Sequence, residues 1–317
     1  MHPRLAAILR RLPIIRELRW WQRLGWRADH LQANQALIAR HLCGKPAPTA
    51  PADPTFGTTS LLCREAHFRL PEYHHWCSEL KIEPVFQRKQ WEFAWILAAL
   101  ERAGALKSGA RALGFGVGRE LLPAYFAGRG IQVTATDQDL SQAITTGWVG
   151  HGQHAAGLVA LSHPRLVSDD DLKRLVSFRV ADMNHIPDDL RGYDFLWSAC
   201  ALEHVGSLDL AQAFIERSLA CLRPGGVAVH TTEFNAGSDE HTITKGLTVL
   251  FRRRDLVALS ERLARQGHVM APLELEPGTG FLDQYVDMPP FNRDASLRLL
   301  LERHIASSTG ILIRRAS

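Results

Sequence analysis

The sequence of 317 residues predicts an α/β fold, in which a mostly parallel sheet carries helices on both faces. Short apolar runs with the character of strands alternate with helical patterns over most of the chain, as in βαβ units. Two glycine-rich turns interrupt this alternation where the chain must reverse direction. Hydrophobic residues make up 46% and charged residues 22%, which is a globular composition with an ample core.

The first 45 residues differ from the remainder in charge. They contain nine Lys or Arg and two acidic residues, a net charge of +7, so the remaining residues carry −3. Apolar side chains recur at helical spacing, which predicts a basic amphipathic helical extension over residues 1–45. These side chains are Leu5, Ile8, Leu9 and Leu12, followed by Trp20, Trp21 and Trp26.

Three roles are open for this extension. A helix folded onto its own domain or onto a partner subunit is the favoured interpretation, because basic amphipathic patterns are common in ordinary helices. Arg and Trp on one helix also suit an anionic membrane surface. RNA binding ranks third and nucleic acid is not expected as a partner, because no glycine–aromatic RNA-binding signature accompanies the charge.

The absence of targeting patterns and the arrangement of cysteines indicate where in the cell the protein is expected. Arginines interrupt every candidate apolar core of a secretory signal peptide, and no run reaches the ~20 apolar residues of a spanning helix. The five cysteines form no CxxC pair, which argues against a disulfide framework and a zinc ribbon. We expect a cytoplasmic protein, with a peripheral position at the inner face of a membrane as the alternative.

The chain divides into three predicted parts. A Pro/Ala-rich linker over residues 46–60 connects the extension to a catalytic domain over residues 61–317. The domain contains a strong helix from Gln87 to about Ala105, whose apolar face is expected to pack on the sheet. A His-His-Trp run over residues 74–76 either lines an aromatic substrate wall or caps a helix, and both interpretations stay open.

A glycine-rich turn follows this helix. Gly114, Gly116 and Gly118 alternate, so the backbone can approach a ligand where a Cβ would collide. The next strand-like run ends on Asp137, where a carboxylate can accept hydrogen bonds from two ribose hydroxyls. A dinucleotide-binding fingerprint would place its third glycine at the position of Arg119. The pattern therefore favours a nucleotide-type cofactor other than a dinucleotide.

Three further signals follow the glycine turn in order. Pro224 is expected to end a helix, and Gly225 and Gly226 to supply positive φ for the turn into a strand. The signals are a strand over residues 178–182 that ends in Asp182, a strand and loop over Tyr193–Val205, and a Leu-Arg-Pro-Gly-Gly turn over residues 222–226 before the apolar run 227–232.

These four signals together resemble the class I S-adenosylmethionine (SAM)-dependent methyltransferases. The resemblance implies a Rossmann-like sheet whose final strand, here near residues 311–314, runs antiparallel beside the fifth. It also implies SAM as the methyl donor and S-adenosylhomocysteine as the product. In that family an acid at the position of Asp182 binds the adenine amino group, and the next apolar residue, here Met183, lies on the adenine ring.

The site residues for the cofactor follow from the glycine motif and from the resemblance. No metal is expected, because His151 and His154 have metal-like spacing but no nearby carboxylate cluster. The chain departs from the family at Ala112, where many members carry an acid, and in a long, glycine-containing insertion over residues 139–177. The residues assigned to SAM are Gly114, Phe115, Gly116, Gly118, Asp137, Gln138, Asp182, Met183 and Ser198.

The acceptor is expected above the carboxyl ends of the strands, where such sheets place their ligands. His204 is the candidate general base, with Glu203 beside it to orient the imidazole or to act as the base itself. Glu233, just past the fifth strand, is a second candidate for binding a hydroxyl. His230 is expected in the core, whereas His185 could face the adenine or lie on the surface.

The predicted acceptor is the hydroxyl of a small molecule or a glycan. The Asn-Pro-Pro-aromatic signature of amino methyltransferases is absent after the fourth strand. Residues 197–204 and 229–235 resemble, more weakly, bacterial methyltransferases associated with surface-polysaccharide modification. We predict O-methylation by in-line transfer from SAM. Two alternatives stay open, a methyltransferase-like binding domain without turnover and an NAD-type oxidoreductase.

Overall fold

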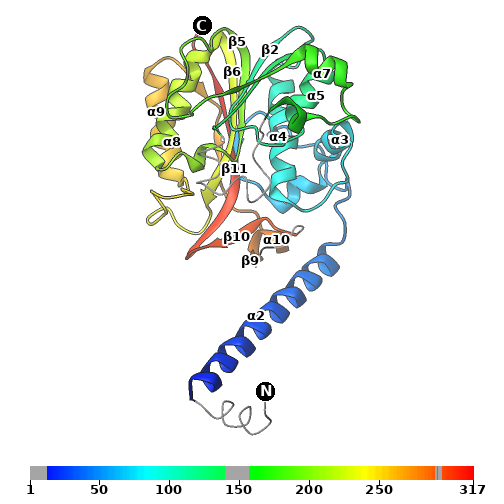
Figure 1. Ribbon diagram of the computed structural model, residues 1–317, viewed down its shortest axis with the longest axis vertical. Helices are drawn as coiled ribbons and strands as arrows, with labels where there is room; N and C mark the ends of the chain where they lie inside the picture. Colours follow the sequence, from blue (N-terminus) through cyan, green and yellow to red (C-terminus); the bar gives the residue numbers. More distant parts are fainter. Residues whose placement is uncertain (1–12, 140–156, 290, 292–294) are drawn as a thin grey trace, which may run out of the picture.

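The computed structural model describes residues 13–139, 157–289, 291 and 295–317, and it shows a central sheet between two layers of helices (Figure 1). The α/β prediction is therefore confirmed. In order across the sheet, the strands are β4 (Val176–Val180), β3 (Gln132–Asp137), β2 (Arg111–Gly114), β5 (Tyr193–Ala199), β6 (Leu222–Asn235), β11 (His304–Arg314), β10 (Arg298–Leu301) and β9 (Val286–Asp287), and β7 (Val269–Met270) also pairs with β11.

Strands β4 to β6 of this order pair in parallel, whereas β11 is antiparallel to β6. The antiparallel final strand expected near residues 311–314 is thus confirmed. Its pairing runs from Arg314 opposite Val227 to Ala306 opposite Asn235, so both strands are longer than the sequence predicted. The parallel arrangement brings the carboxyl ends of β2, β3, β5 and β6 to one edge of the sheet.

Helices cover both faces of the sheet (Figure 1). On one face lie α3 (Pro71–Glu79), α4 (Arg88–Arg102), α5 (Leu122–Gly128) and α7 (Asp169–Leu175), and on the other lie α8 (Leu208–Ser218) and α9 (Arg253–Arg265). Short 3-10 helices are η1 (Glu65–Arg69), η2 (Leu158–Leu161), η3 (Leu202–His204) and η4 (Leu219–Cys221).

The stretch over residues 222–226 corrects one prediction. The helix before it ends at Ser218 and β6 already begins at Leu222, so Pro224 lies within the strand instead of ending the helix. Gly225 has the expected positive φ of 72°, but Gly226 does not. A Cβ on Gly226 would lie 2.9 Å from the carbonyl oxygen of Arg223, so glycine is needed there for close packing of the backbone.

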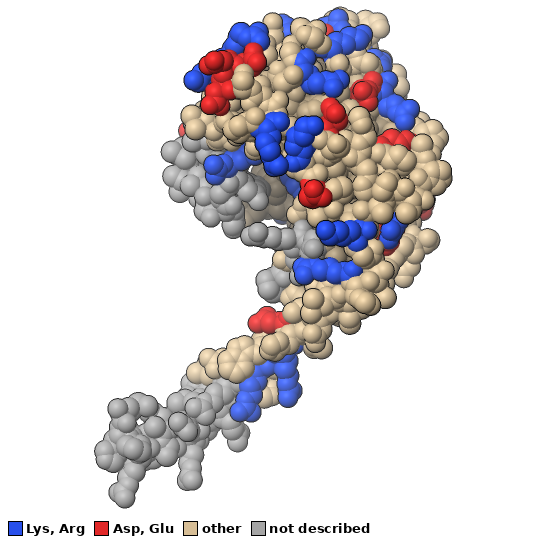
Figure 2. All heavy atoms as spheres, turned by 90° about the vertical axis from the view of Figure 1, so that its right-hand side faces the viewer, with Lys and Arg blue, Asp and Glu red and all other residues tan. Residues whose placement is uncertain are grey.

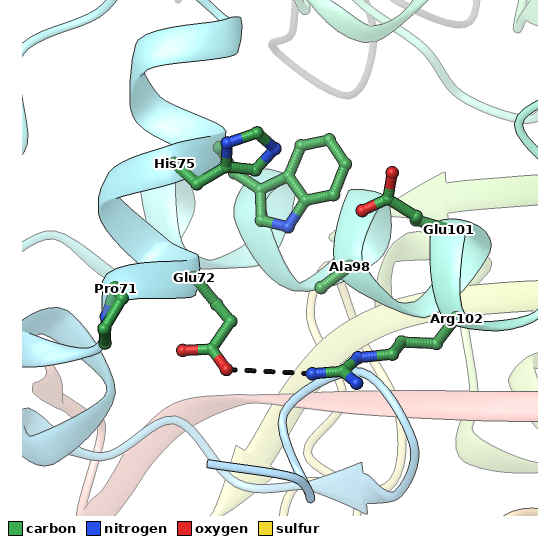
Figure 3. A pocket seen from close by; sticks show the side chains of 7 residues that line it. Pro71, Glu72, His75, Ala98, Glu101 and Arg102 are labelled. Carbon is green, nitrogen blue, oxygen red and sulfur yellow. Dashed lines mark ion pairs between the residues drawn. The ribbon is translucent and has the colours of Figure 1, made fainter. Parts of the chain in front are cut away.

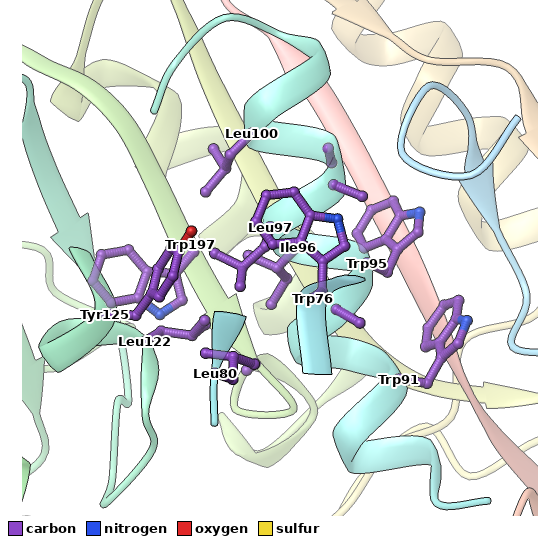
Figure 4. Packing of buried hydrophobic residues seen from close by; sticks show 14 of the residues in the cluster. Trp76, Leu80, Trp91, Trp95, Ile96, Leu97, Leu100, Leu122, Tyr125 and Trp197 are labelled. Atoms are coloured by element: carbon purple, nitrogen blue, oxygen red, sulfur yellow. The ribbon is translucent and has the colours of Figure 1, made fainter. Parts of the chain in front are cut away.

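Helix α4 packs on the sheet as predicted. Its tryptophans Trp91 and Trp95 are fully buried and stack with their ring centroids 6.0 Å apart (Figure 4). Gly310 in β11 makes this approach possible, because a Cβ there would lie 2.4 Å from the Trp95 ring. The helix is therefore fixed at close range to the strands whose ends carry the candidate acceptor site.

The predicted N-terminal helix is present as α2 (Pro13–Cys43), which projects from the domain (Figure 1). Among its side chains whose burial is described, the buried ones lie in the C-terminal part and recur at helical spacing: Gln32, Ala36, Ala39 and Cys43. Gln32 donates to Asp287 at 3.4 Å, near the short helix α10 (Phe281–Gln284). The apolar positions 5, 8, 9 and 12 lie outside the described residues. None of the helices in the described ranges is long and apolar enough to cross a membrane.

The segment predicted as a linker, residues 46–60, contains a core residue. Phe56 is fully buried. Gly57 lies against α4, where an added Cβ would come within 2.7 Å of the Ala98 backbone. Beyond it, β1 (Ser60–Leu61) pairs with β8 (Leu273–Glu274). The three-part division of the chain stays a prediction.

A neutral histidine joins the N-terminal segment to α4. His67 is 3% exposed, and its Nδ1 accepts hydrogen bonds from the backbone N–H of Arg64 at 3.2 Å and from Trp91 Nε1 at 3.0 Å. Burial lowers the pKa of His67 to about 3, with the charge of Arg64 acting in the same direction. The imidazole is therefore neutral in the folded protein at every pH above about 3.

We expect this histidine to make folding sensitive to acid. The unfolded imidazole protonates near pH 6.5, so its contribution is present above that pH and declines as the pH falls from 6.5 toward 3. In His67→Gln the amide oxygen can still accept a hydrogen bond, but no titrating group remains. Urea unfolding at several pH values should show that the free energy of unfolding of the wild type falls, relative to that of His67→Gln, by about 1.4 kcal/mol per pH unit below 6.5. A constant difference between the two proteins would contradict this.

Candidate active site

The glycine turn is tied to the neighbouring strand at both ends. Thr136 Oγ1 donates to the carbonyl oxygen of Gly114 at 2.8 Å, and the N–H of Val117 donates to Thr136 O at 3.0 Å. Gly116 and Gly118 adopt φ values of +59° and +51°, in the left-handed region that favours glycine. Glycine is therefore favoured at both positions, and the close approach of this loop to a ligand stays a prediction.

Asp137 lies beneath this loop at the end of β3. Its carboxylate is 8% exposed and accepts the backbone N–H of Gly118 at 3.2 Å and that of Gln138 at 2.8 Å. The two hydrogen bonds fix the carboxylate against the loop. It is placed to receive a polar ligand that lies across the glycines.

Met183 and Asp182 follow β4 and lie beside the loop. A Cβ built on Gly116 would be 3.6 Å from Met183 Sδ, so the thioether adjoins the glycine. Asp182 accepts the backbone N–H of Asn184 and pairs with His185 Nδ1, both at 2.8 Å. His185 thus lies next to the acid that the resemblance assigns to the adenine.

Two of the residues assigned to the cofactor direct their side chains elsewhere. Phe115 packs edge-on against Phe214, with ring centroids 5.1 Å apart. Ser198 Oγ lies 2.8 Å from His230 Nδ1, in the interior. Both residues can offer a ligand only backbone groups. His230 is fully buried as expected, and burial lowers its pKa to about 3.

Glu120 is a candidate that the sequence analysis missed. It lies at the end of the glycine loop, where its Oε1 accepts the indole N–H of Trp197 at 2.5 Å. Burial raises the pKa of Glu120 to about 8, although the Trp197 hydrogen bond and the charge of Lys89 oppose the shift. Its place directly after Gly118 and Arg119 is the signal that could have identified it.

The candidate acceptor side contains two buried carboxylates, Glu203 in η3 after β5 and Glu233 in β6. The prediction that Glu233 lies just past the strand is wrong, because β6 continues to Asn235 through its pairing with β11. Glu203 is fully buried and accepts from Thr232 Oγ1 at 3.2 Å, and burial raises its pKa. Glu233 pairs with Arg88 at 2.5 Å. Among the described residues, Glu203 Oε1 and Glu233 Oε2 are buried oxygens without a hydrogen-bond partner. Buried acceptors of this kind favour a ligand that donates hydrogen bonds.

His204 adjoins this pair through its Nε2, which is 3.7 Å from Glu203 Oε1. Its Nδ1 lies 2.6 Å from the carbonyl oxygen of Leu247. A carbonyl can only accept, so Nδ1 carries the proton of the neutral ring and Nε2 keeps a lone pair. The sequence named His204, Glu203 and Glu233 as candidates for the acceptor side, and the structure places all three at the same side of the sheet.

The first turn of α4 completes this cluster, and the sequence analysis did not predict its contribution. Glu92 is fully buried and accepts from Cys200 Sγ at 2.9 Å and from Ser308 Oγ at 2.5 Å. Lys89 Nζ lies 3.3 Å from Glu92 and donates to the carbonyl oxygen of Ala199 at 2.8 Å. Charged residues one helical turn apart beside two tryptophans were the available signal.

Cys200 lies between these acids in a strained backbone conformation, with φ +48°. Its Sγ and carboxylate oxygens of Glu203 and Glu233 lie within 4.8 Å of one another, and in the described part of the chain they form a group that could hold a metal ion. The expectation of no metal site concerned His151 and His154, which lie outside the described residues.

Two pockets lie away from this cluster. One of about 270 Å³ lies between α3 and the C-terminal half of α4, where Glu72 pairs with Arg102 at 3.7 Å and His75 lines the wall (Figure 3). The other, of about 640 Å³, lies past the end of β6 and includes His241, Arg252 and His304. The His-His-Trp run therefore borders a pocket, but at the end of α4 away from Glu92.

Comparison with known proteins gave structural matches only. No protein-family model and no curated protein match the chain. It is similar to solved SAM-dependent methyltransferases. These include the 1,6-didemethyltoxoflavin N1-methyltransferase of Burkholderia thailandensis with bound 1,6-didemethyltoxoflavin and S-adenosylhomocysteine (17% identity, 70% of this chain and 76% of that one, TM-score 0.40).

Two further matches are a TehB-like SAM-dependent methyltransferase from Corynebacterium glutamicum (17% identity, 69% of this chain and 85% of that one, TM-score 0.37) and a SAM-dependent methyltransferase from Methanosarcina mazei (13% identity, 66% of this chain and 94% of that one, TM-score 0.40). Such distant likenesses assign no function. The functional inference rests on the residues of this chain.

The loop geometry predicts that Gly116 tolerates no side chain. In Gly116→Ala the residue would keep its positive φ, and its new Cβ would lie 2.7 Å from Ala201 Cβ. The matched control is Gly104→Ala, where φ is +68° and no atom lies within 4 Å. The control should cost about 1–2 kcal/mol of unfolding free energy, which is the penalty of a left-handed residue alone. Gly116→Ala should cost clearly more by urea unfolding, and equal costs would show that the loop has room.

Proposed function

We propose that the protein is a SAM-dependent methyltransferase that methylates a hydroxyl of a small-molecule or glycan acceptor. The observation that carries the proposal is the juxtaposition of two sites at one sheet edge. A glycine loop lies against the buried Asp137, and next to it are carboxylate oxygens of Glu203, after β5, and of Glu233, in β6, that have no hydrogen-bond partner.

The loop side fits a nucleoside cofactor. Gly116 and Gly118 adopt left-handed backbone conformations, and the thioether of Met183 lies beside Gly116. In the proposed complex Asp137 accepts hydrogen bonds from the ribose hydroxyls, and Asp182 and Met183 contact the adenine. The backbone of the glycines and of Phe115 and Gln138 lines the remainder. SAM supplies a methyl group activated by the positive charge of its sulfonium.

The acceptor side fits a hydroxyl nucleophile. Glu203 or the Nε2 lone pair of His204 removes the hydroxyl proton, while the oxygen forms a bond to the methyl carbon. The methyl–sulfur bond breaks and its electron pair stays on sulfur, so S-adenosylhomocysteine leaves. Burial raises the pKa of Glu203, so its ionised form is a stronger base than an ordinary carboxylate. Glu233 Oε2 accepts a second hydroxyl of the acceptor and so orients it.

Cofactor binding tests the proposal directly. At 100 times its dissociation constant, SAM should stabilise the protein by about 2.7 kcal/mol, a melting shift of about 5–10 °C for a domain of this size. NAD should cause none. Asp137→Ala should weaken SAM binding about 100-fold, because it removes charge-assisted hydrogen bonds to two hydroxyls.

The control is Asp194→Ala, which removes a carboxylate at the start of β5 that pairs with Arg223 and accepts the backbone N–H of Arg111, at the opposite end of β2 from the loop. This variant should bind SAM as the wild type does. A shift with NAD alone would favour the oxidoreductase. No shift with either compound would make a binding domain without turnover the leading interpretation.

Glu120 predicts how cofactor affinity changes with pH. Its pKa of about 8 means that it is mostly protonated at pH 7, and a nearby cation favours its ionised form. SAM carries the sulfonium charge and S-adenosylhomocysteine does not. The ratio of the two affinities should therefore shift toward SAM by about three- to tenfold between pH 7 and pH 9. Calorimetric titrations of both compounds measure it, and Glu120→Gln should remove the pH dependence.

A further inference from the structure

Helix α2 carries a regular seam that the domain does not use. Seven positions follow one another at alternating spacings of three and four residues, the pattern of a two-stranded coiled coil. They span three heptads, and five of them hold large apolar side chains: Trp21, Leu24, Ala28, Leu31, Gln35, Ile38 and Leu42.

The seam is exposed to solvent in the single chain. Trp21, Leu31 and Leu42 are 64%, 65% and 62% exposed, and Ile38 is 54% exposed. The buried residues of α2 are at other positions: Gln32 and Ala39 flank the seam on one side, and Ala36 and Cys43 lie further round the helix. The described seam side chains are therefore not covered by the domain, and they are open to a second helix along the projecting part of α2.

The projecting part of α2 also lacks a packing partner within the described chain. From Glu17 to Leu31, every side chain described is exposed except the half-buried Leu24. Isolated helices of this length are marginal in water, because most helical stability in proteins comes from packing of an apolar face. The helix accordingly requires a surface that covers the seam.

We propose that α2 pairs with α2 of a second copy of this chain as a two-stranded coiled coil. Each of the large apolar side chains of the seam would bury on the order of 100 Å², and with the flanking Leu18 and Trp20 the total approaches the ~800 Å² per partner of a stable interface. Gln35 is the polar seam residue, and a single polar residue of this kind fixes the register of the two helices.

The pattern favours a second helix over a lipid surface. A helix that lies on a bilayer presents a wide apolar face. Here the seam takes two positions per heptad, and the positions on one side of it after Trp20 are polar: Arg27, Asn34 and His41. On the other side, Gln32 and Ala39 are buried and so are not open to lipid. Basic side chains lie on the projecting helix (Figure 2), and Arg23 and Arg27 are exposed outside the seam. They remain in water when the seams pair.

Light scattering and sedimentation of the full chain at micromolar concentration test the pairing. The wild type should have the mass of two chains. Leu31→Glu places a charge in the seam and should raise the dissociation constant about 100-fold or more. The matched control is Leu37→Glu, which introduces the same charge at a residue 59% exposed on the other side of the helix, and it should stay dimeric. Unchanged melting temperatures would show that the domains fold normally.

Two results would overturn the proposal. One is a monomeric wild type. The other is a dimer that survives Leu31→Glu, which would place the contact elsewhere. The same proteins are mixed with vesicles of phosphatidylcholine and phosphatidylglycerol. If the wild type is monomeric and cosediments with the vesicles, and the Leu31→Glu variant does not, the seam binds lipid instead of a second helix.

Discussion

The buried carboxylate of Glu92 is the interaction on which the arrangement of the candidate site depends. One side chain of α4 accepts hydrogen bonds from Cys200 after β5, Thr231 in β6 and Ser308 in β11. Burial opposes its ionisation, but the charges of Lys89 and Arg88 and these hydrogen bonds outweigh it, so the pKa of Glu92 is lowered. An ionised group without these donors would be unstable in the interior. The hydrogen bonds of Glu92 therefore hold the helix, the end of β5 and the strands β6 and β11 in one geometry.

Much of the fold could be predicted from the sequence because its signals are local. The glycine turn, the acidic end of β3, the strand at residue 193 and the antiparallel final strand all appear where they were expected. The sequence could also have predicted which face of the sheet the β5 side chains point toward. Residues alternate across a strand, so Trp197 pointing toward Glu120 sends Ser198 to the opposite face, where it meets His230.

The acceptor side was less predictable, because its partners lie far apart in the chain. Glu233 meets Arg88 across 145 positions, and Glu92 meets Ser308 across 216. Residues 203 and 204 could be named because they follow a strand end, where ligands of such sheets lie. The local signal for Arg88, Lys89 and Glu92, charged residues one helical turn apart beside two tryptophans, does not by itself show that they turn inward. Only the approach of α4 to the sheet, permitted by Gly310, makes that first turn part of the site.

The position of Cys200 has a consequence for the chemistry proposed. A thiolate is the nucleophile that an activated methyl group would alkylate most readily, and this sulfur lies among the residues of the acceptor side. Burial and the negative charges of Glu203 and Glu92 raise the pKa of Cys200 far above its usual range, and its S–H donates to Glu92. The sulfur thus stays protonated and a poor competitor for the methyl group. Glu203, proposed to remove the acceptor proton, would thus also help to keep the sulfur of Cys200 from being methylated.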